Sequence, residues 1–241
     1  MSQLKRYIIP AVLIFALWIT LVEIRPLVII PHCVAHPSEC LSQSVNGLDR
    51  LTMGENNGTA EEFSNYGQIT AGILALFAPL IFWFRKKSAP RRGISALQDL
   101  LIICQVIALN GALTELIRLI VQRPRPFVYE NPAFYGQELQ NYTSFVSGHT
   151  SFSTAAVSAL VLVLVSRQAP RKLVTSIAIL GGFVAVGTGI CRVFAGRHFM
   201  TDVMAGAVCG LTSAMIIGYF WGIISCRRRP QPAGDSPTRS A

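Results

Sequence analysis

Long apolar runs recur along this chain, and they constrain its fold more than any other feature of the sequence. A helix needs about 20 consecutive, mostly apolar residues to cross the hydrocarbon core of a bilayer. Hydrophobic residues make up 51% of the chain and charged residues only 14%. Six runs approach the spanning length, at 7–22, 69–84, 94–117, 150–165, 173–190 and 203–224. We therefore predict an all-α fold, a polytopic membrane bundle of six transmembrane helices.

Lys and Arg residues set the expected topology, because short cytoplasmic connectors of membrane proteins carry an excess of them. On one side of the predicted bundle lie Lys5, Arg6 and the basic residues at 85–92, 167–172 and 227–229. We therefore expect both termini in the cytoplasm. The net charge of +9 is then mainly a topology signal. Nucleic acid is not an expected partner, because the basic residues lie in connectors and a tail and form no folded basic surface.

One membrane-embedded domain is predicted over 1–226. The polar outer loop at 31–66 is too short and too poor in apolar residues to be a separate domain, and the basic tail at 227–241 is expected to be disordered. Cys33 and Cys40 lie seven residues apart in that loop, where we expect an oxidising compartment. A disulfide and two unpaired thiols are both compatible with this pattern.

A polar segment at 191–202 separates the last two apolar runs, and ionisable groups at a membrane edge are costly enough to suggest function. His198 and Asp202 are four residues apart, so a helix would place them on the same face. A carboxylate on one ring nitrogen fixes the tautomer and leaves the other nitrogen as a base or nucleophile. The alternative is an ordinary helix N-terminus, with Asp202 as a first-turn acid and His198 among lipid headgroups.

Two further polar clusters lie on the same predicted side of the membrane. Arg118 and Arg125 follow the third run, and the planar fork of a guanidinium suits phosphate oxygens; a loop that contacts headgroups would also explain them. Ser147, Gly148 and His149 come directly before the fourth run. Ser147 is a natural N-cap there, the backbone at Gly148 can approach an anion, and His149 can donate a proton. Capping explains Ser147 but not His149.

Together these clusters resemble the three-part signature of the type 2 phosphatidic acid phosphatase superfamily, the integral-membrane lipid phosphate phosphatases. The signature covers 118–202, and the six-span plan extends the resemblance over nearly the whole chain. The matching order is Arg118-x6-Arg125-Pro126, then Ser147-Gly148-His149, then Arg192-x5-His198-x3-Asp202. Arg197 matches no position of this signature, and we expect it to contact headgroups.

The resemblance implies a role for each matching residue. His198 would attack phosphorus, with its imidazole oriented by Asp202. His149 would protonate the leaving oxygen and later activate water. The phosphoryl oxygens would be held by Arg118, Arg125, Arg192, Ser147 and the Gly148 amide. The family needs no metal ion, so neither a metal nor another cofactor is expected.

Three positions depart from the family pattern: Arg118 replaces Lys, Val146 replaces Pro and Cys191 replaces Ser. An Arg in place of a Lys keeps the charge but changes its reach, which can alter substrate preference. None of the three changes removes a group that makes or breaks a bond. We therefore expect an active enzyme.

The expected function is hydrolysis of a lipid phosphate or diphosphate at the outer face of a bacterial cytoplasmic membrane. Phosphatidylglycerol phosphate, phosphatidic acid, polyprenyl diphosphate and lipid A phosphate are the candidate substrates. One alternative is a lipid phosphotransferase that uses the same phosphohistidine, and another is a protein that binds or transports anionic lipids without chemistry. The sequence does not indicate an oligomeric state.

Overall fold

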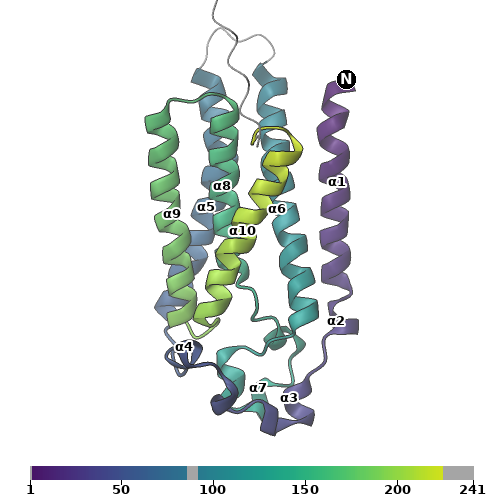
Figure 1. The fold of residues 1–241 in the computed structure, drawn as a ribbon, viewed down its shortest axis with the longest axis vertical. Coiled ribbons are helices and arrows are strands. Elements are labelled where there is room, and N and C mark those ends of the chain that lie inside the picture. Colours follow the sequence, from purple (N-terminus) through teal and green to yellow (C-terminus); the bar gives the residue numbers. More distant parts are fainter. Residues whose placement is uncertain (1, 86–91, 225–241) are drawn as a thin grey trace, which may run out of the picture.

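The computed structural model describes residues 2–85 and 92–224, and every regular element in these residues is helical. The long helices run side by side as a bundle, and the short helices gather at one end of it (Figure 1). The long helices are α1 (Ser2–Glu23), α5 (Gly58–Arg85), α6 (Arg92–Val121), α8 (Gly148–Ser166), α9 (Arg171–Phe194) and α10 (Met200–Phe220). The short ones are α2 (Arg25–Val28), α3 (His32–Ala35), α4 (Gly47–Arg50) and α7 (Pro132–Tyr135), with 3-10 turns η1 (Pro37–Glu39), η2 (Ser42–Ser44), η3 (Pro126–Tyr129) and η4 (Leu139–Tyr142).

Five of the described helices, α1, α6, α8, α9 and α10, are long and apolar enough to cross a membrane. Apolar side chains exposed on the outside of the bundle, such as Phe183 on α9 and Val208 on α10, suit a lipid environment. The sixth predicted run, 69–84, lies inside α5, which is not one of these five. The all-α membrane fold is therefore confirmed, and the sixth span stays a prediction. The tail predicted at 227–241 lies outside the described residues.

Helix α8 lies at the centre of the bundle and packs against α5, α6, α9 and α10. Most of its side chains are buried, and its apolar residues are spread around the helix instead of along one face, as expected for a central helix. Glycines on α10 permit the close approach of the two helices: a β-carbon at Gly206 would lie 2.7 Å from the carbonyl oxygen of Ser147. Small residues commonly permit such contacts between membrane helices. The N-termini of α8 and α10 are thereby brought together at the same end of the bundle.

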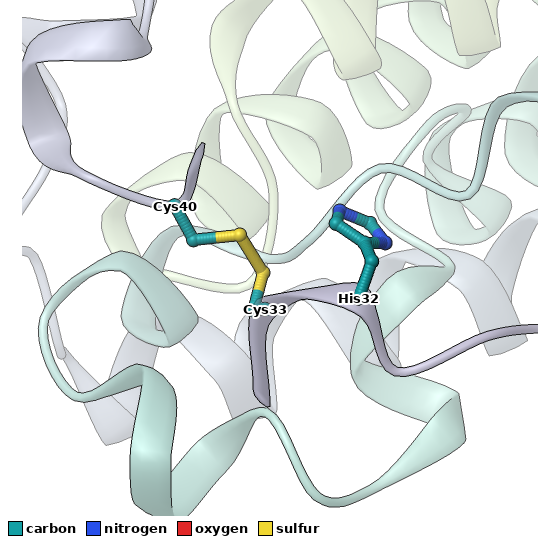
Figure 2. A group of neighbouring side chains, drawn as sticks. All are labelled: His32, Cys33 and Cys40. Atoms are coloured by element: carbon teal, nitrogen blue, oxygen red, sulfur yellow. A yellow bond between two sulfur atoms is a disulfide. The ribbon is translucent and has the colours of Figure 1, made fainter. Parts of the chain in front are cut away.

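The short elements form a layer over that end, which we call the cap and define as residues 29–57 and 126–143. A disulfide joins Cys33 to Cys40 in this layer (Figure 2). The hydroxyl of Tyr142 donates to the carbonyl of Gly136 and accepts from the amide of Cys33. The two cysteines are buried in one cluster with Ile29, Leu119, Val128 and Tyr142. This cluster includes Leu119 of α6, so this part of the outer loop is packed onto the bundle.

Candidate active site

A cavity of about 370 Å³ lies between the long helices near the end that carries the cap. Most of the predicted site residues line it. Its polar wall contains Arg118, Arg125, Gly148, His149, Arg192 and His198. Its apolar wall includes Trp18 from α1, Ile107 from α6 and Phe152 from α8. Ser147 and Asp202 do not line the cavity, and both are fully buried. The three clusters of the sequence thus meet at one place, with Ser147 and Asp202 behind the surface.

His198 lies in the turn between α9 and α10. Gly196 has a φ of +66°, which a side chain would disfavour, and a β-carbon there would collide with the backbone of Glu55 in the cap. The turn reverses the chain so that the imidazole faces the cavity. Nδ1 of His198 lies 2.8 Å from the carbonyl oxygen of Ser144, to which it donates when the ring is neutral. The lone pair of the neutral ring is then on Nε2.

The imidazole of His198 is held neutral by its surroundings. Burial, together with the nearby charges of Arg125 and Arg192, lowers its pKa to about 3, although Asp202 acts in the opposite direction. A neutral imidazole has a free nitrogen lone pair at pH 7. His198 is therefore in the protonation state that a nucleophile requires.

Asp202 occupies the third position of α10 and accepts several hydrogen bonds. Its Oδ2 accepts from the amide of Phe199 at 3.0 Å and from the hydroxyl of Ser144 at 2.5 Å. The distance from this oxygen to Nδ1 of His198 is 3.8 Å, too long for a hydrogen bond. The carboxylate thus caps the helix and is connected to the imidazole through Ser144. The two interpretations of this spacing, a helix start and an oriented histidine, are compatible in the structure.

The three cavity arginines have few partners. Arg118 donates from Nε and Nη2 to the carbonyl of Val146 and from Nη1 to Glu115 at 2.9 Å. Arg192 donates to the hydroxyl of Ser64 at 3.4 Å. Among the described residues, the buried Nε atoms of Arg125 and Arg192 have no hydrogen-bond partner. Buried guanidiniums without full compensation favour a bound anion in the cavity.

Val146 clarifies one departure from the family pattern. Its contribution to the site is its backbone carbonyl, which holds the guanidinium of Arg118. Pro also has this carbonyl, so the contact does not depend on the side chain at position 146. The structure gives no comparable account of Cys191, which is half-buried with a free thiol.

His149 lies at the start of α8 on the cavity wall, and its Nε2 is 2.8 Å from Oδ1 of Asn65 on α5. Ser147 stands at the N-cap position but makes no capping bond with its side chain. Its hydroxyl pairs instead with that of Thr150 at 3.0 Å. Because Ser147 is buried and does not line the cavity, a bond from its hydroxyl to a phosphoryl oxygen would require a local rearrangement.

Sequence reasoning missed the contribution of α5. Glu61 pairs with Arg197 at 2.9 Å and lies 3.8 Å from Arg192, and Asn65 contacts His149. These two residues are four positions apart in the polar first turns of α5, a spacing that places them on one face. Arg197 does not line the cavity, and its partner is Glu61.

Sequence reasoning also missed Ser144 and Arg123. Ser144 acts partly through its backbone carbonyl, which every residue possesses, so no sequence signal identifies it. Arg123 lies between Arg118 and Arg125 and donates to Asp202 at 2.6 Å. Its position in a basic, Pro-containing segment was visible, but its buried partner was not.

Potential metal ligands of the described residues gather in threes at one place, His32, Cys33 and Cys40 in the cap. Figure 2 shows that the two sulfur atoms are bonded to each other. A thiolate is the form of Cys that binds a metal ion, and neither cysteine has one in this state. The group therefore does not fit a metal site.

Comparison with known proteins gives a match to the family model described as the PAP2 superfamily, over residues 99–225. All the matching residues from Arg118 to Asp202 lie within this range. Among solved structures, LpxE of Aquifex aeolicus is 22% identical, with a TM-score of 0.45, over 70% of this chain and 92% of that chain. A transmembrane PAP2 type phosphatidylglycerolphosphate phosphatase from Bacillus subtilis is also 22% identical, with a TM-score of 0.48, over 88% of this chain and 98% of that chain.

Proposed function

Because the chain belongs to the PAP2 superfamily, we propose that it hydrolyses the phosphate or diphosphate of a membrane lipid through a phosphohistidine on His198. The protein is an integral membrane hydrolase of the lipid phosphatase class. The main support for lipid phosphate hydrolysis through His198 is the set of side chains that line one cavity. Three guanidiniums and two imidazoles line it together with Trp18, Ile107 and Phe152. Such a cavity suits a ligand that is anionic at one end and apolar at the other.

In the first step, the Nε2 lone pair of His198 attacks phosphorus and forms the P–N bond, while the bond from phosphorus to the lipid oxygen breaks. His149 gives its proton to that oxygen, so the lipid leaves as an alcohol, or as a monophosphate when the substrate is a diphosphate. The proton at Nδ1 of His198 remains on the ring and is held by the carbonyl of Ser144. The phosphorylated imidazole is therefore positively charged in this intermediate.

In the second step, water attacks the phosphohistidine. His149, now neutral and without its transferred proton, accepts a proton from the water. The P–N bond breaks, its electron pair returns to Nε2 of His198, and inorganic phosphate leaves. The enzyme is restored, because His149 again holds a proton and His198 is again neutral.

The arginines stabilise the charge that develops on the phosphoryl oxygens in both steps. Arg118, Arg125 and Arg192 surround the cavity, and the first turn of α8 offers the amide of Gly148. Fixed cations in a site that excludes water stabilise such a transition state strongly. They supply the positive charge that a metal ion supplies in other phosphatases, so the proposed reaction is metal-independent.

The proposed orientation has six spans, with α5 as the sixth, and both termini in the cytoplasm. It is supported by the basic connectors, such as 167–172, which lie at the ends of α8 and α9 remote from the cap. The cavity then opens at the outer face of a cytoplasmic membrane. There the substrate phosphate rests at the surface while its chains stay in lipid. The candidate substrates are phosphatidylglycerol phosphate, phosphatidic acid, polyprenyl diphosphate and lipid A phosphate.

Phosphate release from a panel of these four lipid phosphates, by purified protein in detergent with chelator present, tests the proposal. Release from at least one lipid is expected, with none from the His198→Ala variant. Gly187→Ala is the matched control, because a β-carbon there meets open space. Transfer of the phosphate to a lipid or sugar hydroxyl would identify a phosphotransferase instead. Binding of the lipids without turnover, unchanged by His198→Ala, would identify a binding or transport protein.

A further inference from the structure

Arg123 bridges the buried carboxylates of Asp49 and Asp202, which are far apart in the sequence. Its Nη1 donates to Oδ1 of Asp202 at 2.6 Å, and its Nη2 donates to Oδ2 of Asp49 at 2.7 Å. Both carboxylates are fully buried, and the Arg123 side chain is 17% exposed. Arg123 belongs to no signature position and does not line the cavity. A buried guanidinium between two carboxylates is costly to disturb, because removing it leaves both charges uncompensated.

Asp49 brings the cap into this arrangement. It lies on α4, where the side chain of Asn46 caps its amide. Its carboxylate accepts from the amide of Thr201 at 2.9 Å and from the hydroxyl of Thr201 at 2.6 Å. Burial opposes ionisation, but the hydrogen bonds from Thr201 and Arg123 hold the pKa of Asp49 below its ordinary value. The ionised carboxylate therefore holds the first turn of α10 directly beside Asp202.

The other end of the arrangement reaches His198. Oδ2 of Asp202 accepts from the hydroxyl of Ser144, and the carbonyl of Ser144 faces Nδ1 of His198. The backbone of Arg123 also accepts from the amide of Ser144 at 3.0 Å. Its guanidinium lies 4.1 Å from the ring centroid of Phe199, the residue after His198. Arg123 thus contacts Ser144 and Asp202, which lie near Nδ1 of the imidazole, and Phe199, the next residue in the chain.

We propose that Asp49 and Arg123 are positioning residues for His198. Asp49 holds Arg123 and Thr201, and Arg123 holds Asp202 and Ser144. The carbonyl of Ser144 accepts a hydrogen bond from Nδ1, so that Nε2 faces the phosphate. This inference rests on the proposed function, in which His198 is the nucleophile. The cap is then a part of the catalytic apparatus, although it contributes no residue to the chemistry. The alternative is an ion pair that only fastens the cap to the bundle.

The two interpretations differ in what the substitutions Asp49→Asn and Arg123→Gln change. A catalytic group that is displaced by about 1 Å can lose about 100-fold in activity. We expect that loss in kcat, with KM changed by less than about threefold, because the arginines that hold the phosphate are untouched. The double variant should lose less than the product of the two single losses, because Asp49 and Arg123 contact each other and act on the same imidazole. Arg123→Lys, which keeps the charge, should lose less than Arg123→Gln.

The matched control is Arg50→Gln on the same short helix. The side chain of Arg50 is exposed, and among the described residues its hydrogen bonds go to the carbonyls of Gln43 and Val45, so kcat should stay at the wild-type value. Folding is followed by thermal unfolding and by size-exclusion chromatography in the same detergent, and kcat is expressed per folded protein. The yield of phosphorylated enzyme in a single turnover is measured beside kcat, and it should fall with kcat.

The outcomes separate this inference from the proposed function. Turnover that survives in His198→Ala overturns both. If His198→Ala is inactive, wild-type kcat per folded protein in Asp49→Asn and Arg123→Gln overturns only the positioning role. Losses of kcat in these two variants that multiply in the double variant also overturn it, because effects of independent residues combine in that way. Low kcat with unchanged KM, and a loss in the double variant smaller than the product of the single losses, supports it.

Discussion

A β-carbon on Gly148 would lie 2.6 Å from Nη2 of Arg118, so the start of α8 and the guanidinium compete for one space. Arg118 reaches this place because the carbonyl of Val146 and the carboxylate of Glu115 hold its other nitrogens. The glycine therefore does two things at once. It exposes its amide to the cavity, and it leaves room for a cation beside that amide.

Gly148→Ala should displace Arg118 from the cavity without unfolding the helix, because Ala is the best helix former. A misplacement on the order of 1 Å in a phosphate-binding group can reduce catalysis by about 100-fold. We expect kcat/KM to fall about 10- to 100-fold, measured by phosphate release. Gly187→Ala meets nothing within 4 Å and should behave as wild type. Wild-type kcat/KM in Gly148→Ala would show that the guanidinium has another productive position.

His149→Ala should slow the hydrolysis of monophosphates most. A general acid typically contributes about 10²- to 10⁴-fold, and a poor leaving group depends on it more than a good one. The loss should therefore be smaller for a lipid diphosphate, whose leaving group is a phosphate. The measurement is the ratio of variant to wild-type kcat for a paired mono- and diphosphate lipid. Equal losses for the two substrates would contradict the acid role.

Protonation of His198 should destabilise the fold. Its pKa is lowered from 6.5 to about 3 in the folded protein, so the unfolded chain binds more protons between these two pH values. The stability associated with this group is present above pH 6.5 and is lost as the pH falls toward 3. Thermal unfolding in detergent should show a smaller loss over this window for His198→Gln than for wild type. Identical pH profiles would contradict burial of a neutral imidazole.

Reduction of the Cys33–Cys40 disulfide should loosen the cap. The chain-entropy relation for a loop of this length gives about 2–3 kcal/mol of stabilisation. A reductant should therefore lower the unfolding temperature of the wild type. The double variant Cys33→Ser, Cys40→Ser should already unfold at the lower temperature and should not respond to reductant. A response of equal size in both proteins would assign the effect elsewhere.

Glu138, which is exposed in the cap, should lie outside the cell membrane. A Glu138→Cys variant, made in a background without Cys104, Cys191, Cys209 and Cys226, should react with an impermeant thiol reagent from outside intact cells. Lys172→Cys, at the start of α9, is the matched control and should react only after the membrane is opened. The reverse pattern would place the active site in the cytoplasm.

The sequence predicted the parts of this protein that depend on short-range patterns. Apolar runs located most of the helices to within a few residues. The exception is α5, which begins at Gly58, so the last part of the predicted outer loop at 31–66 is helical. The start of α5 is polar, and an apolar run therefore does not mark it. The three predicted motifs lie close together in the structure because each one is at the cap end of a long helix. Spacing also brought His198 and Asp202 close together, at 3.8 Å.

Contacts between distant segments were beyond the reach of those patterns. Asp49 and Thr201 are 152 residues apart, and neither shows a local signal for the other. The hydrogen bond from His198 goes to a backbone carbonyl, which is present at every position and has no side-chain signature. The partner of His149 lies on α5, a helix outside the three matched motifs. In each case the partner is determined by how the helices pack.

The contact between Asp49 and Thr201 also concerns the order in which the chain is made. Asp49 is synthesised early, whereas Thr201, Asp202 and His198 come with the last helix. A nascent chain that has completed only α9 holds neither the proposed nucleophile nor the partners that α10 gives to Asp49. Under the proposed function, activity therefore arises only after α10 has been made and has joined both the bundle and the cap.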